Sequence, residues 1–222
     1  MPTDWFRTTA WGGLHTQDFE TRLARSSKQK RPQYLKVKAI ALDTAGQSDE
    51  ADELLRRVIV EYPDSLDCAF AHELRGDMFR RSGDLSGAED SYRNALLRRP
   101  DLNATSGVIP LSLSEVLFEQ HGPKAADEIR SLLAYPEMRI VFNVHQVRAL
   151  TLSARLADAV GNTDLRRIEA ARALEAAAAP SQFSRHPGIG VSNLTDADLK
   201  ELERLASPRP SPLTRRRLWR QR

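Results

Sequence analysis

A cysteine and a histidine, Cys68 and His72, are the first residues whose types and spacing suggest chemistry. They stand four apart on a predicted helix, so their side chains share one face, and a thiol beside an imidazole resembles a nucleophile with its base. The competing interpretation, which we favour, is a small apolar cysteine packed beside a partly buried histidine. Because Cys68 is the single cysteine, neither an internal disulfide nor a cysteine-built zinc site is expected.

Other patterns resemble parts of catalytic motifs, but each lacks a required member. His72-Glu73-Leu74-Arg75-Gly76 begins like a metalloprotease helix, yet Gly76 stands where the second histidine ligand is needed. Gly188-Ile189-Gly190 has two glycines of a phosphate loop without the preceding strand or the third glycine. A solvated helix face explains the adjacent carboxylates better than paired-carboxylate catalysis does; these are Asp49-Glu50, Asp52-Glu53 and Asp127-Glu128. We therefore expect no enzymatic activity, no cofactor and no metal, although a helical-repeat enzyme or regulator stays a third alternative.

Length and composition predict one domain with appendages. The chain has 222 residues, of which 41% are hydrophobic and 28% charged, so it can bury a core. No apolar run approaches the roughly 20 residues that cross a bilayer, and the first residues lack the order of a signal peptide. We expect a soluble, cytoplasmic protein.

The net charge of +3 hides an uneven distribution. Residues 207–222 hold six arginines and no acid, and residues 1–36 carry +4. The segment between them, 37–206, carries −7. Two basic ends therefore flank an acidic middle.

The sequence repeats with a period of 37 residues. Displacement by this period superimposes identical or similar residues; these include Gly46 on Gly83, Ala51 on Ala88, Arg56 on Arg93, Pro63 on Pro100, Leu55 on Tyr92 and Ala39 on Gly76. A further step takes Ala88, Tyr92 and Ala95 to Ala125, Ile129 and Leu132. Each unit is predicted to form two helices, broken at Gly46 or Gly83 and ended by Pro63 or Pro100. The small residues would let the paired helices approach closely.

The second unit resembles a tetratricopeptide (TPR) repeat through its small, aromatic, Gly, Ala and Pro positions, namely Gly76, Phe79, Gly83, Ala88, Tyr92, Ala95 and Pro100. TPR units usually have about 34 residues, so these are slightly longer. The first unit matches at Leu35, Ala39, Leu42, Gly46, Ala51, Leu55 and Pro63. A third begins near Pro110, and a fourth hairpin over 140–178 is split at Gly161-Asn162. The opening, with Asp4-Trp5-Phe6-Arg7 and Trp11, also resembles a bacterial group of helical-repeat proteins.

The resemblance implies an all-α fold, a right-handed superhelix (solenoid) of about four TPR-like hairpins with N- and C-terminal capping helices. Residues 1–31 are expected to form an aromatic cap on the first hairpin, or alternatively an aromatic anchor for a partner. The array occupies 32–178. A loop and a capping helix, beginning near Thr195-Asp196, occupy 179–206. Residues 207–222 form a basic tail, which we expect to be disordered.

By the geometry of the family, the first helices line a concave groove that binds a protein or peptide segment. The expected groove residues are Lys36, Ile40, Asp43, Glu73, Asp77, Arg80, Arg81, Arg148 and Arg155. Ile40 stands where the family's clamp for terminal carboxylates has asparagine, so that specificity is not predicted. A scaffold or adaptor role follows from the resemblance, and the oligomeric state does not.

The basic tail suggests the second function. Its arginines surround Leu218-Trp219 and suit the phosphates of nucleic acid or another anionic surface; the residues concerned are Arg215, Arg216, Arg217, Trp219 and Arg220. Two alternatives stay open. The tail could simply keep the protein in solution, or it could fold back onto the acidic middle of the chain.

Overall fold

The structure is a computed structural model that describes residues 4–183, 185–186, 188–192 and 194–208. All regular elements in these residues are helical, which confirms the all-α prediction. They are α1 (Leu14–Arg25), α2 (Arg31–Thr44), α3 (Ser48–Glu61), α4 (Leu66–Ser82), α5 (Leu85–Arg98), α6 (Ile109–His121), the 3₁₀ helix η1 (Gly122–Ala125), α7 (Ala126–Leu133), α8 (Asn143–Ala159), α9 (Thr163–Ala178) and α10 (Asp196–Ala206).

The chain forms two compact units. Unit 1 contains Met1–Val116 and Ala134–Met138, and unit 2 contains Leu117–Leu133 and Arg139–Arg222. The boundary falls within α6, inside the segment that the sequence assigns to a single array. Helix α6 begins at Ile109, next to the predicted start at Pro110.

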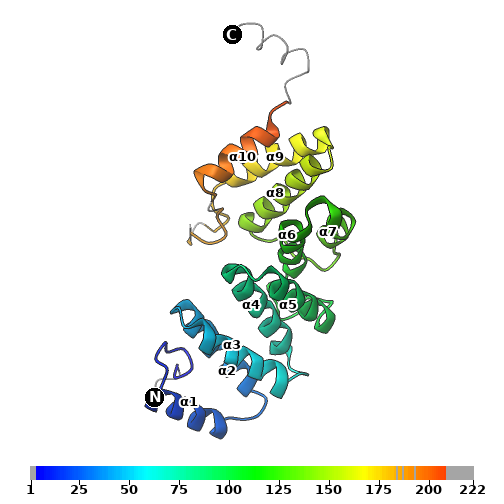
Figure 1. Cartoon of the computed structure of the whole chain (residues 1–222). Helices are drawn as coiled ribbons and strands as arrows, with labels where there is room; N and C mark the ends of the chain where they lie inside the picture. The colour runs from blue at the N-terminus through cyan, green and yellow to red at the C-terminus, as the bar shows by residue number, and fades with distance from the viewer. Residues whose placement is uncertain (1–3, 184, 187, 193, 209–222) are drawn as a thin grey trace, which may run out of the picture. The chain divides into compact units, whose positions relative to one another are not determined.

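Two helical pairs form the body of unit 1, with α2 packed on α3 and α4 packed on α5 (Figure 1). Each pair turns at a glycine with a positive φ, Gly46 at 80° and Gly83 at 84°. Only glycine adopts this left-handed conformation without strain, so both helix breaks lie where the sequence predicts them. The side chain of Asp84 then accepts a hydrogen bond from the backbone of Gly87 and caps α5.

Small residues bring the two helices of each pair together. Ala39, Ala51 and Ala88 are buried. At Gly76 the two helices approach closely, because a Cβ atom there would lie 2.6 Å from Cε1 of Tyr92. The aromatic ring therefore occupies the space that a side chain at position 76 would need. This contact gives the small and aromatic pattern of the second unit its physical cause.

The period of the sequence recurs in the contacts of unit 1. Arg98 Nη1 donates to the carbonyl oxygen of Pro63 at 3.0 Å, across 35 residues. Tyr135 Oη donates to the carbonyl oxygen of Pro100 at 2.9 Å, also across 35 residues. Both donors and both acceptors are displaced by 37 positions. Successive units thus use equivalent backbone carbonyls in equivalent contacts.

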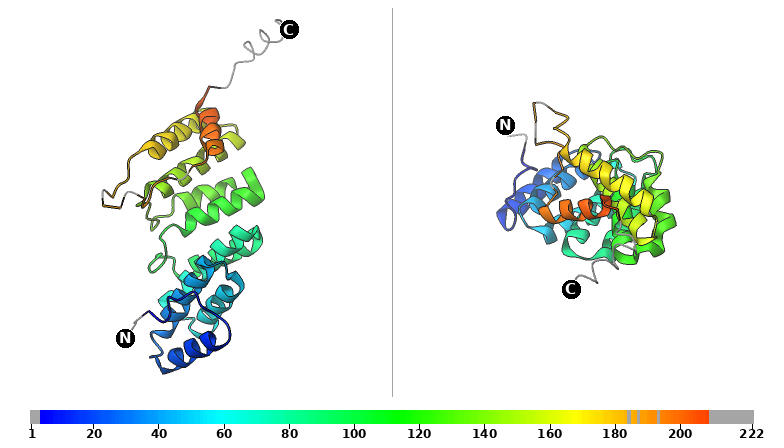
Figure 2. Two further views of the ribbon diagram at one scale, coloured as in Figure 1. Left: turned by 90° about the vertical axis from the view of Figure 1, so that its left-hand side faces the viewer. Right: turned by 90° about the horizontal axis from the view of Figure 1, so that it is seen from above.

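In unit 2, α8 packs on α9 and α10 packs on α9, and the three helices lie next to one another in Figure 1 and in the left-hand view of Figure 2. The break between α8 and α9 lies at Gly161-Asn162, as predicted. Thr195 and Asp198 form a capping box at the start of α10, where the sequence predicts a helix. The buried guanidinium of Arg166 donates to the carbonyl oxygens of Arg204 and Ser207 and holds the end of α10.

Candidate functional site

The charged groove residues of unit 1 mostly pair with neighbouring helices. Arg81 Nη2 of α4 donates to Asp43 Oδ2 of α2 at 2.7 Å. Lys36 of α2 forms an ion pair with Asp67, in the first turn of α4. Arg80 of α4 forms an ion pair with Glu115 of α6. These side chains therefore link α2 to α4 and α4 to α6.

Glu73 does not line an open surface, contrary to the groove prediction. Its side chain is buried, with 5% of the residue exposed. One carboxylate oxygen accepts a hydrogen bond from the Ser106 backbone N–H at 2.9 Å, and the other accepts one from the Ser106 hydroxyl. The reason is the path of the connection between α5 and α6, which passes over Glu73. Burial raises the pKa of Glu73 to about 7 despite these hydrogen bonds.

Ile40 is the apolar member of the predicted groove, and 38% of it is exposed. On α2 it stands between Lys36 and Asp43, the two residues that pair with α4. We call this surface the α2/α4 face and define it by the six side chains that form it, Lys36, Ile40, Asp43, Phe70, Asp77 and Arg81.

Two contacts order the rest of the α2/α4 face. The ammonium of Lys36 lies 4.8 Å from the centre of the Phe70 ring. Asp77, the repeat equivalent of Ile40, accepts a hydrogen bond from the hydroxyl of Tyr92 at 2.6 Å. The side chains around Ile40 are consequently held by partners on the protein itself.

The last two predicted groove residues belong to unit 2. Arg148 Nη1 lies 3.3 Å from His145 Nδ1 on the same helix. Arg155 Nε donates to Glu201 Oε1 of α10 at 3.1 Å, so this arginine joins α8 to the last described helix. The arginines of the predicted tail site lie outside the described residues.

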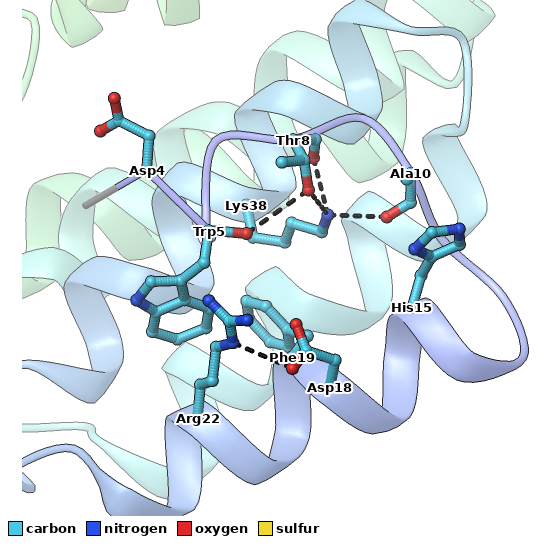
Figure 3. Close-up of a pocket in the computed structure, with 9 residues that line it drawn as sticks. All are labelled: Asp4, Trp5, Thr8, Ala10, His15, Asp18, Phe19, Arg22 and Lys38. Carbon is cyan, nitrogen blue, oxygen red and sulfur yellow. Dashed lines mark hydrogen bonds and ion pairs between the residues drawn. The ribbon is translucent and has the colours of Figure 1, made fainter. Parts of the chain in front are cut away.

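A cavity of about 390 Å³ lies between the N-terminal segment and α1 (Figure 3). Trp5 and Phe19 form aromatic walls, with their ring centres 5.2 Å apart. Trp5, Phe6 and Trp11 also pack against the core of the first hairpin. The N-terminal aromatic residues thus cover one side of α2.

Lys38 on α2 lines this cavity and is the residue that the sequence reasoning missed. It is 1% exposed, and its ammonium donates to the carbonyl oxygens of Thr8 at 2.6 Å and Ala10 at 2.9 Å (Figure 3). It also lies 5.3 Å from the centre of the Trp11 ring. Burial lowers its pKa. Lys38 therefore fastens the N-terminal segment to α2. The one indication in the sequence was that its repeat equivalent, Arg75, is also basic.

The thiol–imidazole interpretation of Cys68 and His72 is not favoured by the structure. Both residues are buried. Burial raises the pKa of the Cys68 thiol, and burial together with Arg98 and Arg75 lowers the pKa of His72 to about 4. Near pH 7 the thiol is protonated and the imidazole is neutral, so the reactive thiolate is not stabilised.

Among the described residues, no group of three or more His, Cys, Asp or Glu side chains is arranged to hold a metal ion. No helix in the described ranges combines the length and the apolar character needed to cross a membrane. Comparisons with protein-family models, with curated proteins and with solved structures find no match to this chain.

Proposed function

We propose that this protein is a binding module, a TPR-like solenoid that captures a segment of a partner protein on the α2/α4 face. The observation that carries the proposal is the position of Ile40, exposed between two ion pairs that join α2 to α4. Protein interfaces commonly place an apolar contact at the centre and polar groups around it. The α2/α4 face has this arrangement on a small scale.

The ion pairs also reduce the cost of binding. Side chains that must be ordered on binding lose conformational entropy, which weakens association. Asp43 and Arg81 already hold each other at 2.7 Å, and Asp77 is held by Tyr92. A partner segment would therefore meet a surface whose charged groups are largely in place.

The repeated contacts support the proposed architecture. Carbonyl oxygens of Pro63 and Pro100 accept equivalent hydrogen bonds, as expected when similar helical units stack on one another. Stacked units of this kind present their first helices as one continuous surface. A role as a scaffold or adaptor follows, with the partner chosen by the side chains of α2 and α4.

The test is site-specific photocrosslinking in the native cell. A benzoylphenylalanine is placed at position 40 and, as a control, at position 97. Leu97 is suitable because it is 80% exposed and lies on α5, outside the α2/α4 face. We expect a discrete crosslinked partner from position 40 that position 97 does not give. The same products from both positions, or none from position 40, would contradict the proposal.

A further inference from the structure

A second hollow in unit 1 lies beside the α2/α4 face. It is a cleft of about 370 Å³ between the first turn of α3 and the last turns of α4. Met78 and Phe79 supply apolar lining, while Asp49, Asp52 and Arg81 supply charge. We call it the α3/α4 cleft. It meets the α2/α4 face at Arg81, which lines the cleft and also donates to Asp43.

The charges of the α3/α4 cleft leave a negative excess. Asp52 accepts a hydrogen bond from Arg75 Nε at 2.6 Å, and Arg81 is neutralised by Asp43. Asp49 is exposed and forms no ion pair with any described residue. An apolar lining beside an unneutralised carboxylate suits a long basic side chain, whose aliphatic part packs while its head meets the acid.

The acidic excess of the chain lies mainly in residues 37–116, which include the residues that line this cleft. Residues 37–116 contain 15 acidic and 9 basic residues, a net charge of −6. Residues 117–206 contain 12 acidic and 11 basic residues, a net charge of −1. The two hairpins of unit 1, residues 31–98, hold 13 acidic and 10 basic residues, a net charge of −3, and so contribute to the field that attracts a basic partner.

One basic segment of matching charge belongs to the chain itself. Residues 209–222 hold six arginines and no acid, with Leu218 and Trp219 among them. We propose that the α3/α4 cleft is a docking site for this segment, from the same chain or from a second copy. An arginine enters the cleft, its methylene groups lie on Met78 and Phe79, and its guanidinium pairs with Asp49.

Docking of segment 209–222 would regulate the binding surface. The cleft and the α2/α4 face share Arg81, so a segment seated in the cleft competes with a partner for that side chain. This regulatory consequence rests on the proposed function. The docking itself does not, because it needs only the chain and its own basic segment.

The experiment measures fluorescence anisotropy of a labelled synthetic peptide, residues 209–222, added to a chain ended after Pro208. This truncation removes no described residue. We expect saturable binding at low salt that weakens as salt rises, because the contact is electrostatic. Asp49→Lys should weaken it about tenfold, which corresponds to about 1.4 kcal/mol. A peptide with its arginines replaced by glutamine should not bind.

The chain offers a matched control for Asp49. Asp164 is likewise an exposed aspartate at the second position of a helix, α9, and forms no ion pair with the described residues. Asp164→Lys makes the same charge change and should alter the affinity less than twofold. Circular dichroism checks that both variants keep their helices.

Three results would overturn the docking proposal. One is the absence of saturable binding at low salt, and another is an equal loss of affinity in the two variants. The third is a peptide that binds a single-stranded oligonucleotide but not the chain, which would assign segment 209–222 to nucleic acid. None of these depends on the crosslinked partner, so the docking proposal and the proposed function can fail separately.

Discussion

The carboxylate of Glu73 accepts both hydrogen bonds that Ser106 offers, one from its backbone N–H and one from its hydroxyl. This pair ties α4 to the connection between α5 and α6. In that connection Leu102 and Ala104 have positive φ values of 56° and 62°, which residues with a Cβ adopt at some cost. Glu73 therefore stabilises a strained segment of the backbone.

The pKa of Glu73 makes stability depend on pH. Because burial raises this pKa from 4.5 to about 7, the folded protein binds more protons than the unfolded chain between these values. The contribution of Glu73 to the stability of the folded protein is fully present below pH 4.5 and is lost as the pH rises through about 7. Ionisation of Glu73 with rising pH should lower the free energy of unfolding by up to about 3 kcal/mol, and this decrease should be absent in Glu73→Gln. Urea denaturation of both proteins between pH 4.5 and 7 measures this free energy. If it changed with pH in Glu73→Gln as it does in the unmodified protein, the raised pKa of Glu73 would be contradicted.

His72 has the opposite effect. Burial lowers its pKa from 6.5 to about 4, so its contribution is present above pH 6.5 and is lost as the pH falls through about 4. Its Nδ1 atom has no hydrogen-bond partner, so His72→Leu should be tolerated. In that variant the Glu73 effect acts alone, and stability should fall with rising pH. In Glu73→Gln, stability should instead increase with rising pH. If stability changed with pH in the same direction in both variants, this account would be refuted.

Contact between Gly76 and Tyr92 predicts a specific steric cost. An added Cβ at position 76 would lie 2.6 Å from the ring, and the ring is held by the hydrogen bond from its hydroxyl to Asp77. Gly76→Ala should therefore destabilise the protein by about 1–3 kcal/mol. Gly188→Ala is the control, because no atom lies within 4 Å of its added Cβ. Thermal melts that shift equally in the two variants would argue against the predicted packing.

Ala88 tests the packing from the other helix of the same pair. It is completely buried, so Ala88→Leu should overpack the contact between α4 and α5 and cost about 1–3 kcal/mol. Ala134 is exposed just beyond the end of α7, and Ala134→Leu should leave the melting temperature nearly unchanged. Two melts that match the unmodified protein would show that the hairpin is packed differently.

The hairpins could be predicted from the sequence because their determinants are local and repeated. Gly83 ends α4 by its own conformational freedom, and Ala88 and Tyr92 lie on one face through helical spacing. The same period relates Arg98 to Tyr135, whose hydrogen bonds to carbonyl oxygens are equivalent. Each of these features can be predicted from the sequence of one repeat unit and of the unit next to it.

The candidate site was less predictable because it depends on segments outside the period. Glu73 is buried by Ser106, which belongs to a connection with no counterpart in the first unit. Lys38 is buried by Thr8 and Ala10 of the N-terminal segment. Arg80 and Arg81 are both predicted to line the groove; Arg81 is exposed and Arg80 is half-buried, and each pairs with another helix. Reversing their charges would therefore disturb the fold as well as the surface.

Ile40 provides the most direct test of the proposed function. The side chain of Ile40 forms no hydrogen bond or ion pair, and glutamate is a good helix former. Ile40→Glu places a charge at the apolar centre of the α2/α4 face, while Leu97→Glu makes the same change on a second helix. The measurement is the dissociation constant of the crosslinked partner, determined by calorimetry with each purified variant. We expect Ile40→Glu to weaken binding at least about tenfold and Leu97→Glu to leave it unchanged. Equal affinity of Ile40→Glu and the unmodified protein, with identical melting curves, would contradict binding at the α2/α4 face.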